Sequence, residues 1–525
     1  MRGFVKTRSV ARPTQLAIFI SILAIAMRFF LIDQPYIDNW SWRQSDVAAI
    51  ARNFYQNGFH FGKPQIDWAG DTPGYVGTEF PILPFVAAIC YKIFGVHEWI
   101  GRIQGVVLFA ASLPFFFLLV RDLLGATAAA WALFFYSFAP LNLFTGREFM
   151  PDVPSLSLAL IGLYFFLRWI DQERLTTLLA SAVCVSLSIL IKLPSVLIGV
   201  PLFYLTIGRV RDRRILSRHS SDGHPPSWNY GATSRPPLQF LILFAVIALL
   251  PSAIWYWHAH LIAEKFYPYH FFGAGGIRIM SAGWYGKIAK QITTSSLTPV
   301  LFALAAAGAF VTRTCPERQS NGSIKRVRIF HWWLAAMIVF IVVVGYGSRH
   351  QWYQLPLVPI AAALAGGTCA SLASKVPKRS VRITLSTLLA GSFSILAFHY
   401  VRPFYQPSAA ELRDLGLELR RTTPQNSLIV AADNGDPTIF YYAERKGWHF
   451  LEKNGIYDGD PGDNQQLIVD LEQLRGRGAT HLVFISSTFW WLDYYHEFAE
   501  HFANSTMPLG ATSEFRIYKL NLAKE

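Results

Sequence analysis

Residues 100–120 read IGRIQGVVLFAASLPFFFLLV, and residues 124–142 read LGATAAAWALFFYSFAPLN. Each run is almost free of charge and is close to the ~20 residues that an α-helix needs to cross a bilayer. Only a short connection that contains Arg121 separates them. The pair predicts two antiparallel membrane-spanning helices, and similar runs continue on either side.

The composition of the whole chain is typical of a membrane protein. Of its 525 residues, 52% are hydrophobic and 15% are charged, against roughly 25% charged residues in a typical soluble protein. A soluble domain could not bury that much apolar surface in one core, so we expect residues 1–401 to use lipid as their solvent. The net charge of +14 would suggest nucleic acid in a soluble protein. Because the basic residues lie between apolar runs, we expect a lipid bilayer and no nucleic acid as partner.

About eleven segments are predicted to span the membrane. With soft ends, they are residues 13–32, 100–120, 124–142, 153–169, 175–191, 194–208, 238–257, 297–312, 332–346, 355–373 and 381–400. With the N-terminus in the cytoplasm, every strongly basic loop falls on the cytoplasmic side, where Lys and Arg are enriched. An odd number of spans then places the C-terminus outside. We therefore predict a multi-pass protein of the cell (plasma or inner) membrane.

The longest predicted outer loop comprises residues 33–99. Within it, Ser45–Asn57 carries apolar side chains at helical spacing and polar side chains between them. We expect an amphipathic helix at the membrane surface, with Trp40 and Trp42 as interfacial anchors. Residues 81–95 are apolar but short, so we expect a second interfacial or re-entrant helix there.

Residues 402–525 have a different sequence pattern, in which predicted helices and strands alternate. Helices are expected at Glu411–Arg421, Pro437–Arg445 and Gln465–Arg475, and strands at Ser427–Ala432, His481–Ile485 and Phe515–Leu520. This order predicts a soluble, extracytoplasmic α/β sandwich with a largely parallel sheet. Asp433–Asp436 follows a strand end, where ligand binding and helix capping both remain open, and we favour capping.

Charged and polar residues gather at the outer ends of the predicted spans. The span ends carry Arg147, Glu148, Asp152, Lys192, Arg349, His350 and Tyr353. The first loop adds Asp38, Arg43, Asp46, Lys63, Asp67, Asp71 and Glu79. Polar groups at membrane depth are costly and therefore indicate function. Single members have structural alternatives: Lys192 could extend toward water, and Arg147 could pair with Glu148.

A carboxylate beside cations and lipid suits one type of reaction. A lipid-phosphate leaving group needs Arg, Lys or a metal to stabilise its developing charge. An acceptor hydroxyl or amine needs a carboxylate to take its proton. The pattern therefore favours transfer of a group from a lipid phosphate.

In these motifs the chain resembles the GT-C superfamily of lipid-linked sugar transferases, in the branch of the protein O-mannosyltransferases and lipid A aminoarabinose transferases. The resemblance covers essentially the whole chain. The matching segments are 42–54, 79–83, 94–96 with Arg102, 147–152, 191–194 and 349–356. It implies a GT-C-like catalytic membrane domain at residues 1–401, followed by a soluble domain.

The chain departs from the family in its first outer-loop motif. Many members begin it with adjacent Asp and Glu, whereas this chain has Arg43 and Gln44, and its carboxylate follows at Asp46. On a helix that shift is nearly one turn, so Asp46 is expected to point toward a similar place. Asp38 is the substitute candidate.

The predicted activity is transfer of a hexose or pentose from a polyprenyl-phosphate donor, with inversion, to a glycan, lipid or protein acceptor at the outer face. Asp46 is the expected general base, and Asp152 and Glu148 would position the acceptor or a divalent metal, Mg or Mn. Substrate phosphate or sugar would be held by Arg43, Glu79, Arg147, Lys192, Arg349, His350 and Tyr353. Asp46, Glu148, Asp152, Lys192 and Arg349 should then converge on one cavity. The alternatives are a lipid or polysaccharide transporter or flippase, and a non-catalytic partner in surface-glycan assembly.

Overall fold

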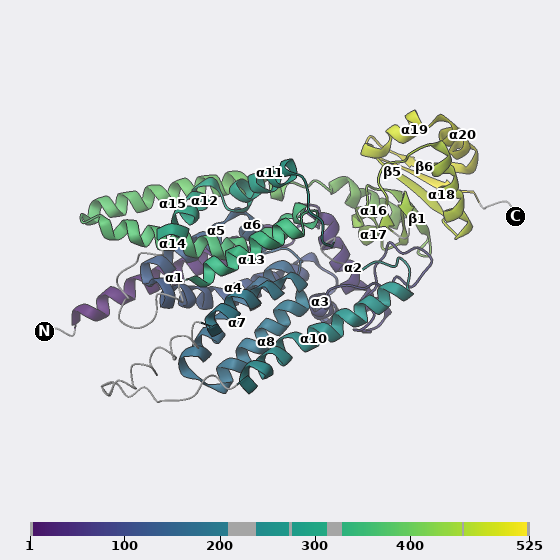
Figure 1. Cartoon of the computed structure of the whole chain (residues 1–525). Coiled ribbons are helices and arrows are strands. Elements are labelled where there is room, and N and C mark those ends of the chain that lie inside the picture. The colour runs from purple at the N-terminus through teal and green to yellow at the C-terminus, as the bar shows by residue number, and fades with distance from the viewer. Residues whose placement is uncertain (1–3, 208–237, 272–275, 312–327, 454–455, 522–525) are drawn as a thin grey trace.

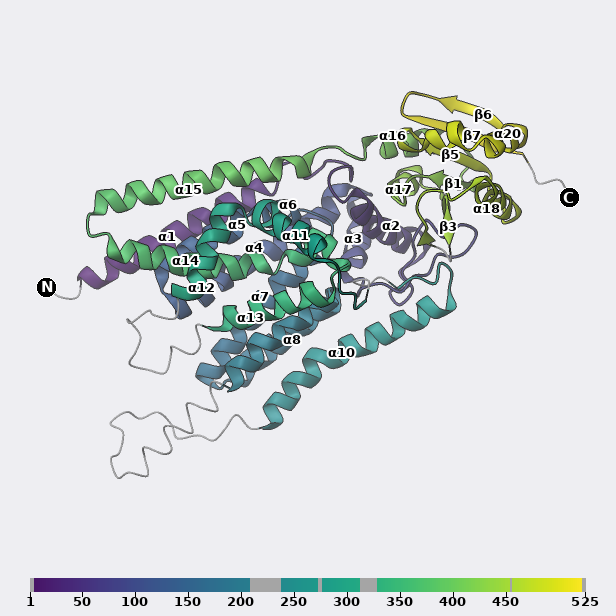
Figure 2. The same cartoon turned by 45° about the horizontal axis from the view of Figure 1, so that its top comes forward.

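The computed structural model describes residues 4–207, 238–271, 276–311, 328–453 and 456–521. They form a bundle of long helices with a small α/β domain at one end, opposite the end where the chain begins (Figure 1). The bundle helices are α1 (Phe4–Met27), α4 (Glu98–Leu124), α5 (Ala126–Phe138), α7 (Asp152–Gln172), α8 (Leu175–Ile191), α10 (Leu238–Lys265), α12 (Pro299–Val311), α13 (Ile329–Val343), α14 (Leu357–Lys375) and α15 (Arg379–Val401). α10 and α15 run along opposite sides of the bundle (Figure 2).

Several of these helices satisfy the requirements for crossing a bilayer, so the predicted helical membrane domain is confirmed. Five described helices are long and apolar enough, or six if Ala282–Ser296 and Pro299–Phe310, bent by 106°, form one span. Each of the eleven predicted segments overlaps a helix, but some helices are short. α5 ends at Phe138 because the residue before Pro140 is extended, with ψ of 135°, as prolines favour. The count of eleven spans therefore stays a prediction.

α2 (Ser41–Asn57) is buried on nearly every side, so it lacks the exposed polar face that its pattern predicted, and its position at the membrane surface stays a prediction. Its apolar side chains, such as Val47 and Ala51, pack with α3 (Ile82–Phe94) and α4. Its polar side chains Asp46 and Arg52 are only 2% and 4% exposed, because the rest of the loop and the C-terminal domain cover them. A periodic pattern shows which side of a helix is polar, but not what covers that side.

The tryptophans before and within α2 are partly buried and pack against Trp352, and their role as interfacial anchors stays a prediction. The Trp40 ring lies 5.3 Å from that of Trp352, and the Trp42 ring lies 5.6 Å from the same partner. α3 differs, since it exposes Ile89 and Ile93 on one face, as an interfacial helix would.

Residues 402–525 contain the predicted α/β domain. Its helices are α16 (Ala410–Thr422), α17 (Thr438–Ala443), α18 (Asn464–Gly476), α19 (Trp490–Tyr494) and α20 (His496–Ser505), and its strands are β1 (Leu428–Ala432), β2 (Lys446–His449), β3 (Glu452–Lys453), β4 (Ile456–Tyr457), β5 (His481–Ile485), β6 (Thr506–Ala511) and β7 (Phe515–Leu520). The main sheet has the order β2-β1-β5-β7-β6. β2, β1 and β5 are parallel, whereas β7 and β6 are antiparallel. The predicted largely parallel sheet is thus correct for three strands and wrong for two.

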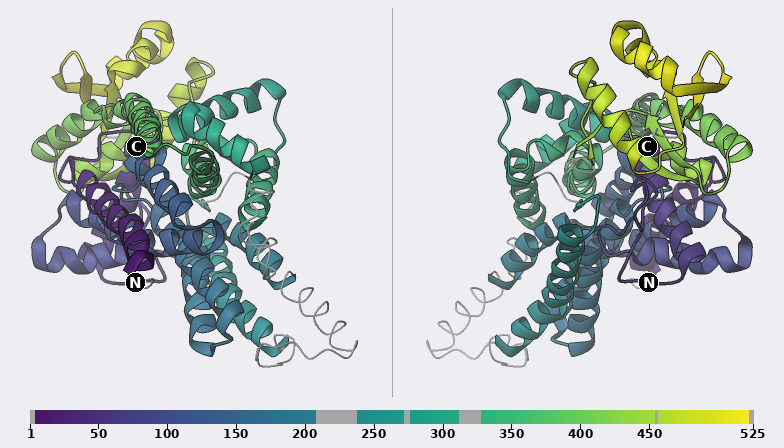
Figure 3. Two further views of the ribbon diagram at one scale, coloured as in Figure 1. Left: turned by 90° about the vertical axis from the view of Figure 1, so that its left-hand side faces the viewer. Right: turned by 90° about the vertical axis from the view of Figure 1, so that its right-hand side faces the viewer.

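The C-terminal domain docks directly on the loop 33–99. The amide of Gly70 donates to the carbonyl of Gly447 at 2.8 Å, and the amide of Gly447 donates to the carbonyl of Asp67 at 3.1 Å. Gly70 has a φ of +57°, and a Cβ there would lie 1.8 Å from the Trp448 ring. Only glycine permits this approach. Viewed end-on, the domain lies over the purple segments of the first hundred residues (Figure 3).

Candidate active site

Five charged side chains meet at the end of the bundle that carries the C-terminal domain. Arg43 of α2 donates two hydrogen bonds of 2.8 Å to Glu79 in the loop before α3. Lys192 lies 3.4 Å from Glu79 and 3.4 Å from Asp152. Asp46 lies 3.9 Å from Arg43. We call these five residues the open cluster, because two pockets reach it.

Prolines place two members of the open cluster at helix ends. Pro194 is two residues after Lys192, so α8 ends at Ile191 and Lys192 is extended, with φ of −150°. Pro151 precedes Asp152, the first residue of α7, and a proline is readily accepted where a helix begins. Both charges therefore sit where the chain leaves or enters a helix.

The carboxylates of the open cluster differ in how tightly they hold a proton. Burial alone would raise the pKa of Glu79, but Arg43 and Lys192 lower it to about 2. Burial raises the pKa of Asp46 to about 6, although Arg43 and a hydrogen bond from Trp68 oppose the shift. Glu79 is thus a fixed negative charge, whereas Asp46 can exchange a proton near neutral pH.

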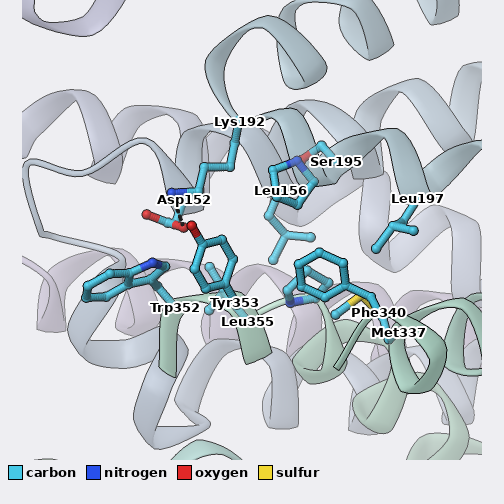
Figure 4. A pocket seen from close by; sticks show the side chains of 12 residues that line it. Asp152, Leu156, Lys192, Ser195, Leu197, Met337, Phe340, Trp352, Tyr353 and Leu355 are labelled. Atoms are coloured by element: carbon cyan, nitrogen blue, oxygen red, sulfur yellow. Dashed lines mark ion pairs between the residues drawn. The ribbon is translucent and has the colours of Figure 1, made fainter. Parts of the chain in front are cut away.

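The first pocket lies between α7, the segment after α8, α13 and the start of α14, and encloses about 370 Å³ of partly open space. Lys192, Asp152 and Tyr353 lie together at one end (Figure 4). The Lys192 ammonium is 5.0 Å from the centre of the Tyr353 ring. The other side chains that line the pocket are mainly apolar and include Leu156, Leu197, Met337, Phe340 and Leu355. The pocket therefore has a charged end and an apolar end.

A second pocket of about 340 Å³ lies between α2 and the start of α3. Arg43, Val47 and Ile50 line it from one face of α2, and Glu79 and Pro84 line it from the other side. Lys192 and Asp152 line the first pocket, so the open cluster forms the boundary between the two pockets.

A separate group of polar residues is fully enclosed, and we call it the closed cluster: Asp38, Gln44, Arg102, Arg147 and Glu148. Asp38 forms an ion pair with Arg147, lies 3.6 Å from Arg102 and accepts a hydrogen bond of 2.9 Å from Gln44. All five residues are at most 1% exposed. Burial and the nearby Asp38 raise the pKa of Glu148 above its ordinary value. The structure thus places Arg147 and Glu148 away from both pockets.

The predicted segment at 349–353 divides between pocket and surface. Tyr353 lines the first pocket. His350 stacks on Trp352 with 4.4 Å between ring centroids, and burial and Arg349 lower the pKa of His350 to about 3. Arg349 is exposed, 3.9 Å above the Tyr346 ring.

The five residues that were expected to converge on one cavity do so only in part. Asp152 and Lys192 line the first pocket, and Asp46 is linked to them through Arg43 and Glu79. Glu148 and Arg349 lie elsewhere. The residue that sequence reasoning missed is Trp68, which donates a hydrogen bond of 3.0 Å to Asp46. In the sequence, Trp68 was marked only by being a large aromatic residue in the long loop 33–99.

The expected divalent metal does not fit the donors that the structure describes. Within the described residues, no three His, Cys, Asp or Glu side chains come together as a metal site. In the open cluster, Asp46, Glu79 and Asp152 each lie beside Arg43 or Lys192, so each carboxylate already has a cationic partner.

One part of the chain matches a family model. Residues 73–221 match the family described as dolichyl-phosphate-mannose-protein mannosyltransferase. This match covers well under half of the chain but includes Glu79, Asp152 and Lys192. No curated protein sequence matches the chain.

Solved structures are similar over nearly the whole chain. ArnT from Cupriavidus metallidurans bound to undecaprenyl phosphate has a TM-score of 0.64 and 14% identity, with 96% of this chain and 98% of that chain covered. The archaeal oligosaccharyltransferase AglB from Archaeoglobus fulgidus, in complex with an inhibitory peptide and a dolichol-phosphate, has a TM-score of 0.56 and 12% identity, with 96% and 74% covered. The arabinofuranosyltransferase AftD from Mycobacteria has a TM-score of 0.52 and 13% identity, with 96% and 40% covered. The TM-scores show a common fold, and at these identities the likeness extends to the fold alone.

Proposed function

We propose that the chain transfers a sugar from a polyprenyl-phosphate donor to an acceptor at the outer face of the membrane, with inversion. The chain has the fold of the GT-C glycosyltransferases, as its sequence motifs predicted. The observation that carries the proposal is the open cluster at the charged end of an apolar pocket. ArnT and AglB were solved with undecaprenyl phosphate and a dolichol-phosphate, which supports a donor of this class. The proposed orientation keeps the N-terminus cytoplasmic and the C-terminal domain outside.

The first pocket is the proposed donor site. Its charged end suits a phosphate and its apolar end suits the first part of a polyprenyl tail. Both contacts of Lys192 with carboxylates measure 3.4 Å, longer than the ~2.7–2.9 Å of a strong charge-assisted hydrogen bond. An ammonium has three donors, so Lys192 keeps capacity for a phosphate oxygen.

The proposed reaction is a direct displacement at the anomeric carbon. The acceptor hydroxyl or amine approaches from the side of the second pocket, which Arg43 and Val47 of α2 line. Asp46 takes the acceptor proton while the new bond to carbon forms and the bond from carbon to the phosphate oxygen breaks. The polyprenyl phosphate leaves with the bonding electron pair, and Lys192 and Arg43 stabilise its charge. A pKa of about 6 for Asp46 suits a base that works near neutral pH.

No step of this mechanism passes through a metal ion, because the carboxylates are already beside Arg43 and Lys192. The cationic side chains neutralise the leaving phosphate instead. We therefore expect transfer to continue in the presence of EDTA, and loss of activity that Mg²⁺ or Mn²⁺ restores would contradict this part of the proposal.

The test uses purified protein in lipid nanodiscs with a panel of undecaprenyl-phosphate sugars and a delipidated envelope extract as acceptor. Release of undecaprenyl phosphate measures transfer. Wild type should release it with at least one donor, Asp46→Asn should not, and Asp33→Asn is the matched control because Asp33 is exposed in the same loop. A chain that moves the intact donor across a vesicle membrane without releasing phosphate would instead be a flippase.

A further inference from the structure

Trp68 lies between the proposed base and the C-terminal domain. Its Nε1 donates a hydrogen bond of 3.0 Å to Oδ1 of Asp46. On its other side, the ring lies against the imidazole of His449 in β2, with 5.4 Å between centroids and 41° between planes. Trp68 and His449 are 8% and 5% exposed, so water is largely excluded from both contacts.

His449 is held by a carboxylate at the end of β1. Its Nδ1 lies 2.8 Å from Oδ1 and 2.9 Å from Oδ2 of Asp433. Asp433 is itself fixed by a hydrogen bond of 3.0 Å from the amide of Gly435. Burial would lower the pKa of His449, but Asp433 raises it above its ordinary value. Asp433 therefore favours the protonated form of His449, whose ring lies against Trp68.

The edge of the sheet that holds Asp433 also holds α2. In α/β domains, the carboxyl ends of parallel strands commonly bind a ligand. Here Ser41 of α2 donates a hydrogen bond of 2.8 Å to Asp436, and the hydroxyls of Ser45 and Thr438 are 2.7 Å apart. The place that a ligand takes in other domains is therefore taken by the helix that carries Asp46.

We propose that Trp68 and His449 are positioning residues for Asp46, through which the C-terminal domain orients this carboxylate and balances its charge. The inference rests on the proposed function, because it assumes that Asp46 accepts the acceptor proton. The other ionisable groups that face these residues are Arg43 and Asp67 beside Asp46, Asp436, Glu452 and Tyr457 beside His449, and His270 beside Trp68. Burial lowers the pKa of His270 to about 4, so it stays neutral over the range that matters.

Two single substitutions, one in Trp68 and one in His449, test whether these residues influence Asp46. Trp68→Phe keeps a ring against His449 but removes the hydrogen bond that stabilises ionised Asp46. His449→Gln removes the cation and leaves the charge of Asp433 uncompensated. Both changes should raise the pKa of Asp46, so the acidic limb of the plot of kcat against pH should move upward by roughly 0.5–1 unit. Adding Asp433→Asn to His449→Gln removes the uncompensated charge and should return the limb toward its wild-type position.

The matched control is His501→Gln, because His501 also contacts a carboxylate in the same domain, 2.7 Å from Glu472. It should leave the acidic limb in place. Unchanged limbs in Trp68→Phe and His449→Gln, with kcat lowered equally at every pH, would overturn the proposal and leave these residues only structural.

A second measurement separates this inference from the proposed function. The protonation of Asp46 can be followed by infrared titration as the difference between wild type and Asp46→Asn, without any substrate. A shift of this titration in Trp68→Phe and His449→Gln supports the link even if no transfer is found in any assay. Transfer by the wild type together with an unshifted titration would overturn the link while the proposed function stands.

Discussion

The open and closed clusters are built from the same types of residue but meet different surroundings. The closed cluster places Asp38 and Arg147 in a space without an opening, and its arginines also donate to backbone carbonyls such as that of Leu31. The open cluster places Lys192 and Asp152 against a pocket. Buried ion pairs of the closed cluster stabilise the fold, whereas those of the open cluster can exchange a protein partner for a ligand. Charge type alone therefore does not distinguish a structural ion pair from a substrate site.

The largest effect is expected when one cation is removed from the closed cluster, which tests whether its ion pairs stabilise the fold. Arg147→Ala leaves Asp38 buried without its nearest cation, and loss of one partner of a buried pair costs roughly 3–5 kcal/mol. We expect little folded protein after extraction and a much lower midpoint of thermal unfolding. Arg168→Ala is the control, because Arg168 pairs with Asp122 at a more exposed site, where an ion pair contributes only about 0–1 kcal/mol. Equal stability of the two variants would contradict the structural role of Arg147.

Within the open cluster, removal of a cation should affect the reaction more than the fold. Lys192→Met should lower the rate of transfer by roughly 100- to 1,000-fold, as loss of one group that stabilises developing charge does. Its thermal midpoint should fall less than that of Arg147→Ala, because the first pocket lets water reach the carboxylates that lose their cation. Lys375→Met, at an exposed position in the last turn of α14, is the control for loss of a lysine. Near-normal transfer by Lys192→Met would exclude Lys192 from holding the phosphate.

Asp46 offers a test in which lost activity accompanies gained stability. Its pKa is raised to about 6 from an ordinary 3.8, so the folded protein pays a penalty for ionising Asp46 that grows as the pH rises from about 4 to 6. Asp46→Asn should remove this penalty and add roughly 2–3 kcal/mol of stability at pH 8, with no gain below pH 4. Thermal unfolding at both pH values measures the effect. A variant no more stable than Asp33→Asn at pH 8 would contradict the raised pKa.

The smallest effect is expected at Glu148. Because burial and Asp38 raise the pKa of Glu148, its neutral form is favoured, and Gln is a close substitute. Glu148→Gln should change stability by less than about 1 kcal/mol and transfer by less than about threefold. Transfer assays at pH 7 measure the effect, and a 100-fold loss would support the role in positioning the acceptor or a metal that the sequence predicted for Glu148.

Much of the fold followed from local pattern, whereas the surroundings of the site did not. Apolar runs predicted the bundle helices, and the motifs around Asp152 and Lys192 predicted two residues that do line one pocket. Nothing local indicated that Glu148 would be enclosed four residues before Asp152, since a short turn can send neighbouring side chains to different compartments. The contact of Trp68 with His449 joins parts of the chain that are remote in sequence. Such docking depends on complementary surfaces, which no single periodicity records.

The docking of the C-terminal domain on the first loop also bears on how the protein is made. Tyr36 donates its backbone N–H to the hydroxyl of Tyr442, 406 positions later in the chain. At ~5–20 residues per second of synthesis, the ribosome needs roughly 20–80 s to cover that distance. During this interval α2 has been translated but lacks the domain that covers its polar side. Completion of the proposed active site therefore waits for the C-terminal domain, and a polypeptide released before Tyr442 would lack the residues that cover α2.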